Sequence, residues 1–263
     1  MVELASYLAI GAATGFFAGL LGIGGGTIIV SSLALMFAAH GFPAPYVMHM
    51  AIGTSLAAIM SGAWASFRTH HRHNSVDWAV VRRMIPGLLV GVFAGAVLAR
   101  FSNTTFLKGF FLGFTALVIA QLMLNLKPRS ARPLPGPAGL TAVALFIGVS
   151  SSLFGGGAAA IGVPFLTWCD MTTHRAIGTV SAMGFPVAIA GALGYALAGI
   201  SVPGLPTGSV GFVYLPAFIG ISISSVLVAP FGARLAHRLA GPTLRRIFAV
   251  FLILLGLKVG LSI

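Results

Sequence analysis

Two runs of glycine interrupt otherwise apolar sequence, and their chemistry suits the binding of an anion. The first run is Gly22-Ile23-Gly24-Gly25-Gly26, and the second is Gly155-Gly156-Gly157. Consecutive glycines weaken a helix and allow positive φ angles, so successive backbone amides can point toward one ligand. A nest of N–H groups at the start of a helix binds oxyanions. The predicted substrate contacts from these runs are Gly24, Gly25, Gly26, Gly155, Gly156 and Gly157.

Hydroxyl side chains accompany both runs. Thr27 follows the first run directly, and the sequence Ala-Ile-Gly-Thr occurs twice, ending at Thr54 and at Thr179 and starting two residues after His49 and His174. Such hydroxyls can donate to an anion, although in a helix they often bond back to a backbone carbonyl. The predicted hydroxyl contacts are Thr27, Thr54, Ser55, Thr179 and Ser181, with Ser150 to Ser152 as further donors near the second run.

The composition indicates an integral membrane protein. Hydrophobic residues make up 58% of the chain and charged residues 7%, which is outside the range of soluble domains. The acidic residues are Glu3, Asp77 and Asp170, and no charged residue lies in the middle of a predicted span, so carboxylate proton relays and sodium sites are not expected. The 15 Lys and Arg lie between apolar segments, which argues against nucleic-acid binding. With Cys169 alone and no zinc-type spacing, we predict no disulfide, metal or cofactor.

Apolar segments form eight blocks, two of which are too long to be single spans. The blocks are 4–39, 45–67, 79–99, 104–126, 138–169, 176–199, 209–233 and 243–262. As continuous helices, 4–39 would measure about 54 Å and 138–169 about 48 Å, against a hydrocarbon core of about 30 Å. Each has its glycine run near the middle, so each must bend there. In many secondary transporters, paired breaks of this kind mark the substrate site.

The chain divides into two related halves. A proline-rich linker at 127–137 separates residues 1–126 from residues 138–263, and the repeated Ala-Ile-Gly-Thr word supports a duplication. If both broken elements enter and leave on one side, the two membrane sides carry twelve and three Lys and Arg; if every block crosses once, they carry eight and seven. The positive-inside rule favours the first arrangement.

The predicted fold is therefore an all-α polytopic membrane protein with two inverted-topology repeats. Each repeat has a hairpin-like, glycine-broken helix followed by three transmembrane helices. The linker is expected in the cytoplasm and both termini outside. The N-terminus has no positive n-region and no clear cleavage site, so we expect it to be retained.

Other functional classes fit less well. An intramembrane enzyme would need a serine and a histidine to meet in the bilayer, but the candidate Ser150 and Ser222 lack the following glycine of a nucleophile elbow, so no catalytic residue is predicted. A non-transporting membrane subunit stays open, although nothing resembles a large interaction domain. His49 and His174 could titrate near neutral pH and couple protons to transport. The cluster from Arg68 to His73 is expected to be a solvated loop that attracts anions.

The motifs taken together resemble the sulfite exporter TauE/SafE family of membrane transporters. The pattern GxxxGLLGIGGG followed by AIGTS, and SSLFGGG followed by AIGTV, spans both halves of the chain. The resemblance implies an inner-membrane protein that moves small sulfur-containing anions such as sulfite or sulfoacetate, often by export. By position, Gly22 to Gly26 and Ala51 to Ser55 match the first-half motifs, and Gly155 to Gly157 with Ala176 to Thr179 match the second.

The second half departs from this pattern, because Ala158 and Ala159 stand where two glycines are expected. The two half-sites are therefore expected to be unequal. The expected partners are a small anionic substrate and membrane lipid. Another oxyanion or carboxylate with proton coupling stays open as cargo, as does the oligomeric state.

Overall fold

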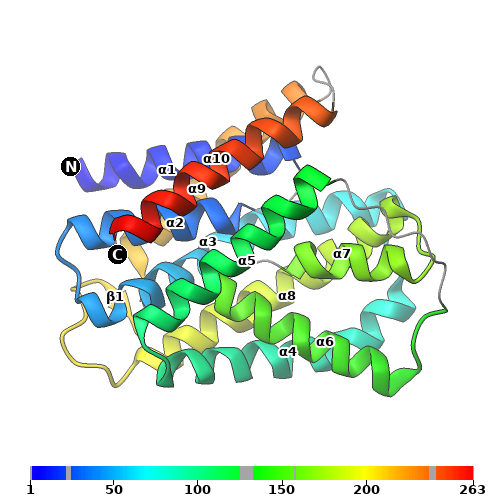
Figure 1. The fold of residues 1–263 in the computed structure, drawn as a ribbon, viewed down its shortest axis with the longest axis horizontal. Helices are drawn as coiled ribbons and strands as arrows, with labels where there is room; N and C mark the ends of the chain where they lie inside the picture. The colour runs from blue at the N-terminus through cyan, green and yellow to red at the C-terminus, as the bar shows by residue number, and fades with distance from the viewer. Residues whose placement is uncertain (1, 22–24, 125–132, 157, 237–240, 263) are drawn as a thin grey trace.

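The computed structural model describes residues 2–21, 25–124, 133–156, 158–236 and 241–262, and they are almost entirely helical (Figure 1). The first half contains α1 (Val2–Leu21), α2 (Gly26–Ala39), a short 3-10 turn η1 (Ala44–Tyr46), α3 (Val47–Arg72), α4 (Trp78–Phe101) and α5 (Thr104–Leu124). The second half contains α6 (Pro137–Phe154), α7 (Ala158–Trp168), α8 (Thr173–Gly199), the strands β1 (Ser209–Val210) and β2 (Val213–Tyr214), α9 (Leu215–Ala236) and α10 (Gly241–Ser262).

Both long apolar blocks are divided at their glycine runs, as predicted. The first becomes α1 and α2, and the second becomes α6 and α7. With 11 residues, α7 is about 16 Å long and cannot cross a bilayer alone. One boundary was wrong: the block at 209–233 begins with the antiparallel pair β1–β2, and its helix starts at Leu215. Hydropathy alone does not distinguish a buried strand from the start of a helix.

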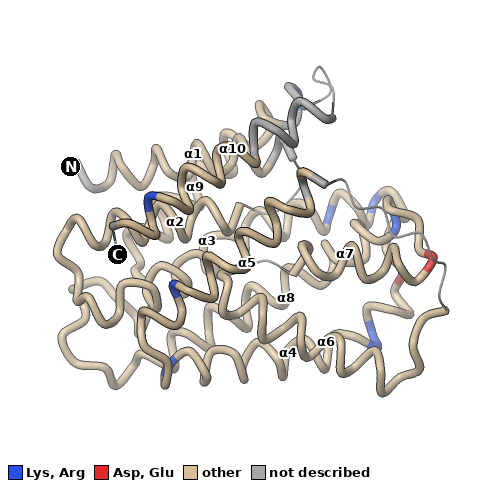
Figure 2. Tube along the Cα trace, viewed as in Figure 1, with Lys and Arg blue, Asp and Glu red and all other residues tan. Residues whose placement is uncertain are grey.

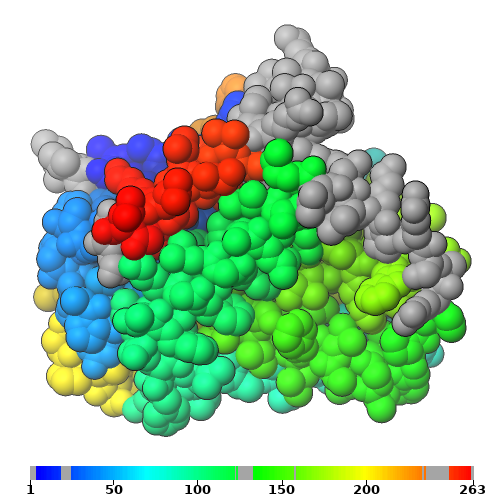
Figure 3. Space-filling model, viewed as in Figure 1, coloured from blue at the N-terminus to red at the C-terminus, as the bar shows by residue number. Residues whose placement is uncertain are grey.

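Six helical segments in the described part of the chain are long and apolar enough to cross a membrane. They are Ala44–Arg72, Trp78–Phe101, Thr104–Gln121, Pro137–Phe154, Thr173–Gly199 and Leu215–Gly232. On the face shown in Figure 3, α5 and α10 lie side by side, and both expose large apolar side chains such as Leu117, Leu254 and Leu257. Exposed apolar surface of this extent is expected of a protein that is surrounded by lipid.

The closest helix packing joins one helix from each half. α1 packs along α9, and α4 packs along α6. Small residues make both approaches possible: a β-carbon on Gly11 would lie 2.5 Å from the carbonyl oxygen of Ile221, and one on Gly87 would lie 2.7 Å from that of Thr141. Gly15 of the first block likewise lies against the backbone of Ser225, as small residues at a close helix contact do.

The connections between helices gather at two opposite ends (Figure 1). We call the end that holds the α3–α4 and α7–α8 connections the basic end, and the end that holds the α4–α5 and α8–α9 connections the opposite end. Lys and Arg lie near both ends of the bundle rather than at its middle (Figure 2). Described side chains near the basic end include Arg68, Arg72, Arg82, Arg83, Arg175 and Arg234, and those near the opposite end are Arg100, Lys108 and Lys258.

Candidate functional site

The two helix breaks meet inside the bundle. The first residue of α2, Gly26, contacts the residues that follow α6, because a β-carbon on Gly26 would lie 2.5 Å from the carbonyl oxygen of Gly155 and 3.5 Å from the Cα of Gly156. We call this contact, formed by Gly26, Gly155 and Gly156, the break junction. It joins segments from the two halves that are about 130 residues apart in the sequence. Gly24 and Gly157 lie outside the described residues.

Only glycine suits the second break. Gly155 and Gly156 have φ angles of +84° and +119°, where other residues are strained. Their amides, however, do not form the free nest that the sequence suggested. Both N–H groups donate to the carbonyl oxygen of Ser151 at 3.0 Å, so they satisfy the C-terminus of α6. In this structure the two glycines shape the turn and their amides cap α6, and substrate contact by them stays a prediction.

Other backbone donors at the junction come from the start of α2. Its first intrahelical hydrogen bond is the one that Ile29 donates to Gly25, at 3.1 Å. The amides of Gly26, Thr27 and Ile28 therefore have no acceptor within their own helix. They carry the partial positive charge of a helix N-terminus, which attracts anions. Gly25 precedes the helix and provides no side-chain cap.

One face of α3 forms the wall of the junction. Ser55 is fully buried, and its hydroxyl donates to the carbonyl oxygen of Gly155 at 3.0 Å, with the carbonyl oxygen of Gly26 at 3.3 Å. Ile52 lies 3.7 Å from a β-carbon placed on Gly155, and Ile59 covers Gly156. Ile52, Ser55 and Ile59 are spaced to share one side of a helix. Ser55 therefore connects both breaks to a membrane-spanning helix.

Further hydroxyl groups lie close to the junction in the sequence. Ser151 and Ser152, in the last turn of α6, are 1% and 0% exposed, and neither hydroxyl has a hydrogen-bond partner among the described residues. Thr27 is 6% exposed at the start of α2. A buried hydroxyl without a partner is costly, so the Ser151 hydroxyl is suited to donate to a bound group. The Ser152 hydroxyl lies against α4 instead, 3.1 Å from a β-carbon placed on Gly95.

Three predicted hydroxyl contacts have different partners. Thr54 and Thr179 both accept hydrogen bonds from backbone amides, at 3.0 Å, in the connections that precede α9 and α4. Ser181 accepts from Ser66 at 3.3 Å, which links α8 to α3. In the structure these three side chains form hydrogen bonds that link separate segments of the chain. Substrate contact by them stays a prediction.

Ser55 directly follows the first Ala-Ile-Gly-Thr sequence, and the residue that follows the second is Val180. Its side chain lies 3.0 Å from a β-carbon placed on Gly162 of α7. A valine cannot donate to a carbonyl oxygen or to an anion. The two halves therefore differ at this position, and the polar wall of the junction comes from the first half.

Charge is absent from the buried interior of the described chain. The buried polar residues there are serine, threonine and a single histidine, His49. The ring Nε2 of His49 faces the carbonyl oxygens of Ala99 and Ser102, at 2.9 and 3.1 Å, so it carries the proton and Nδ1 is left as an unpaired acceptor. No group of three or more His, Cys, Asp or Glu side chains among the described residues could hold a metal ion.

The basic end carries an ion pair and the single cysteine. Arg175 and Asp77 approach to 2.9 Å, with 56% and 23% of their side chains exposed. Cys169 lies in the α7–α8 connection, and partial burial raises the pKa of its thiol above the usual value. The thiol is therefore a weak nucleophile at neutral pH.

A separate apolar groove of about 520 Å³ lies between α3, α8 and α9. It is lined by Met60, Ser61, Trp64, Phe185, Phe218 and Ser222. Helical spacing places Trp64 and Ser55 on opposite sides of α3, so the groove does not open onto the break junction. Sequence reasoning had not indicated this groove, because its residues are apolar like their neighbours.

Two helices broken at a shared junction, within a bundle of membrane-spanning helices, define an α-helical membrane transporter. The sequence model of the family described as "Sulfite exporter TauE/SafE" matches residues 7–259. The chain therefore belongs to the sulfite exporter TauE/SafE family, and it is a multi-pass membrane transporter and not an enzyme.

Its relatives carry the same general description. A "probable membrane transporter protein" from Haemophilus influenzae is 32% identical over 97% of both chains. Another from Methanocaldococcus jannaschii is 26% identical over 84% of this chain and 79% of the relative, and one from Bacillus subtilis is 25% identical over 69% and 74%. No solved structure matches the chain significantly.

Proposed function

We propose that this transporter moves small sulfur-containing anions, such as sulfite or an organosulfonate, through the break junction by alternating access. The observation that carries the proposal is the meeting of the α2 N-terminus with the second break around the buried hydroxyl of Ser55. Backbone amides and hydroxyls at a helix N-terminus favour an oxyanion. Gly25, Gly26, Thr27, Ser55 and Ser151 are the residues through which we expect contact.

The absence of buried charge among the described residues supports this choice of cargo. A cation would need carboxylates, and none is buried there. Partial positive charges hold an anion less tightly than an arginine would. A carrier must bind its cargo and also release it, so moderate attraction suits transport.

We propose export as the direction. An anion that leaves a cell with a negative interior gains about 2.3 kcal/mol per charge for each 100 mV, so no coupling ion is required. The orientation that favours this path has the basic end in the cytoplasm. We further propose that the halves are inverted repeats, with reporters fused at residue 132 active in the cytoplasm and those fused at residue 204 active outside. If the reporters at residues 132 and 204 both lie on the same side of the membrane, this topology is wrong.

The direct test uses purified protein in liposomes loaded with sulfite or sulfoacetate. We expect efflux that accelerates when the interior is made negative, and no efflux from liposomes without protein. Chloride-loaded liposomes serve as the control for non-selective leakage. Intact protein that releases neither anion would contradict the proposed cargo class.

His49 supports a second candidate, in which anion movement is coupled to a proton. Its Nδ1 atom is buried, has no hydrogen-bond partner among the residues that the structure describes, and can accept a proton. The same liposomes, with the potential held at zero, distinguish the two schemes. Efflux driven by a pH gradient, and lost in His49→Gln, would favour coupling; efflux that ignores the gradient would exclude it.

A further inference from the structure

Thr54 holds the start of a helix that belongs to the other half. Its Oγ1 atom is fully buried and accepts a hydrogen bond from the backbone N–H of Tyr214 at 3.0 Å, across 160 residues. Tyr214 immediately precedes α9. The neighbouring Gly53 lies against the same connection, because a β-carbon there would be 2.8 Å from the carbonyl oxygen of Phe212.

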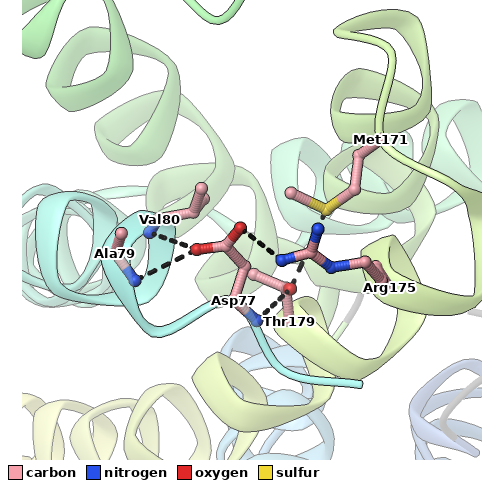
Figure 4. A network of polar contacts seen from close by, with 6 residues as sticks. All are labelled: Asp77, Ala79, Val80, Met171, Arg175 and Thr179. Carbon is pink, nitrogen blue, oxygen red and sulfur yellow. Dashed lines mark hydrogen bonds and ion pairs between the residues drawn. The ribbon is translucent and has the colours of Figure 1, made fainter. Parts of the chain in front are cut away.

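Thr179 forms the same arrangement with the halves exchanged. Its Oγ1 atom is also fully buried and accepts from the backbone N–H of Asp77 at 3.0 Å (Figure 4). Asp77 immediately precedes α4. A β-carbon on the neighbouring Gly178 would be 2.5 Å from the carbonyl oxygen of Ser75. In both cases the glycine packs against a backbone carbonyl of the connection, and the threonine accepts a hydrogen bond from the backbone N–H two residues after that carbonyl.

We call these contacts the Thr54 clasp (Gly53, Thr54, Phe212, Tyr214) and the Thr179 clasp (Gly178, Thr179, Ser75, Asp77). They face opposite ends of the bundle: Thr54, one residue before Ser55 of the break junction, holds the connection from the opposite end, and Thr179 holds the connection from the basic end (Figure 1). Each clasp ties a helix that runs past the junction to the helix that packs on a broken arm. α9 packs along α1, and α4 packs along α6.

We propose that Thr54 and Thr179 are positioning residues that close the two ends of the transport path, each clasp holding one end. The inference rests on the proposed alternating access. Opening the Thr54 clasp would free α9 together with α1, and opening the Thr179 clasp would free α4 together with α6. Each pair contains one arm of a break, so its movement would expose the break junction from one end only.

The two clasps are reinforced differently. The Asp77 carboxylate caps α4 by accepting from Ala79 and Val80, at 3.1 and 3.3 Å, and it pairs with the exposed Arg175. At the Thr54 clasp, the ring of Tyr214 packs against Phe37 and Phe42, with ring centroids 5.8 and 5.2 Å apart. Salt screens an exposed ion pair but not a buried aromatic cluster. High ionic strength should therefore loosen the Thr179 clasp alone.

Access to the junction can be measured without any cargo. In a Cys169→Ser background, Ser55→Cys places one thiol at the junction, and a membrane-impermeant maleimide is added to each side of oriented vesicles. The side of the basic end is assigned from labelling of the native Cys169 in the unaltered protein. Because labelling needs no transported anion, its result is independent of whether sulfite proves to be the cargo.

We expect Thr54→Val to raise the labelling rate from the opposite end, and Thr179→Val to raise it from the basic end, each on the order of tenfold, as loss of one buried hydrogen bond implies. Thr54→Ser and Thr179→Ser should restore the original rates, because serine keeps the acceptor. Thr115→Val is the matched control, since Thr115 is buried but bonds to Phe111 in its own helix. It should change neither rate.

Folding of each variant is checked by thermal unfolding in detergent. If a folded valine variant gains access from both ends equally, or from neither, the proposal is wrong. If the valine variants fail to fold, the Arg175→Gln variant tests the proposal instead, because the Arg175 side chain is exposed and its replacement should not prevent folding. A smaller gain from the basic end alone, reproduced by high salt in the labelled Ser55→Cys protein without further substitution, supports the proposal, and any other pattern overturns it.

Discussion

The hydroxyl of Ser55 donates to the carbonyl oxygen of Gly155, 3.0 Å away and exactly 100 positions later in the chain. This bond fixes a membrane-spanning helix to the break in the other half. It also places one polar side chain where both breaks meet, so small changes at this point should have large effects on transport.

Replacement of Ser55 by alanine should weaken the junction and impair transport. Loss of a buried hydrogen bond that leaves a carbonyl unpaired destabilises a protein by about 1–3 kcal/mol. We expect a lower unfolding temperature and weaker anion binding, measured by thermal shift with added sulfite. Ser61→Ala is the control, because Ser61 lies on the same helix and its hydroxyl donates to a carbonyl of that helix, that of Ala58 at 3.3 Å. Equal anion responses in both variants would contradict a role for Ser55 in binding.

Replacement of Gly26 by alanine should separate the two breaks. The added carbon would lie 2.5 Å from the Gly155 oxygen, and a backbone atom cannot move aside as a side chain can. We expect the protein to reach the membrane and to lose anion efflux in liposomes. Gly113→Ala is the matched control, since no atom lies within 4 Å of the added carbon and alanine favours a helix by about 1 kcal/mol over glycine. Normal flux through Gly26→Ala would argue against the junction as the path.

Changes at Asp77 should separate its two interactions. Asparagine can still cap α4 but loses the charge that pairs with Arg175, whereas alanine loses both. We expect Asp77→Ala to lower stability by about 1 kcal/mol and Asp77→Asn to cost less, because exposed ion pairs contribute little. Thermal unfolding at low and high salt measures this. If the unfolding temperature of Asp77→Asn still depends on salt, the ion pair between Asp77 and Arg175 is not the source of that dependence.

The reactivity of Cys169 should depend steeply on pH. Burial raises the pKa of the thiol, and only the thiolate reacts with a maleimide, so labelling at pH 7 should be slow and should rise through and above pH 9. The measurement is the labelling rate across this range in detergent. His73→Cys, at an exposed position in a Cys169→Ser background, supplies the reference rate. Equal rates at pH 7 would mean that the environment of Cys169 does not suppress its thiolate.

Much of the architecture was predictable because it follows from length and composition. The blocks 4–39 and 138–169 exceed the thickness of a bilayer, so their glycine runs had to be the places where helices end. The strands at 209–214 were missed because apolar strand and apolar helix look alike in hydropathy. The sequence also does not reveal that the Ser151 carbonyl accepts from both Gly155 and Gly156.

Contacts between the halves were beyond prediction from the sequence. The bonds of Thr54 and Thr179 span 160 and 102 residues, and nothing local indicates which amide each hydroxyl meets. Ser181 was a reasonable candidate beside Thr179. Helix rotation of about 100° per residue, however, directs neighbouring side chains to different helices. Of the two residues that follow the second Ala-Ile-Gly-Thr sequence, Val180 faces α7 and Ser181 faces α3.

The pairing of α1 with α9 has a consequence for biosynthesis. Helix α1 is made before α9, because the backbone that its Gly11 and Gly15 fit, around Ile221 and Ser225, lies some 200 residues later in the chain. At about 5–20 residues per second, α1 waits ten seconds or more for its partner. During that interval its glycine-lined surface must be shielded by lipid or by the insertion machinery. Neither half can complete its packing alone, so expression of an isolated half should yield a product that is degraded.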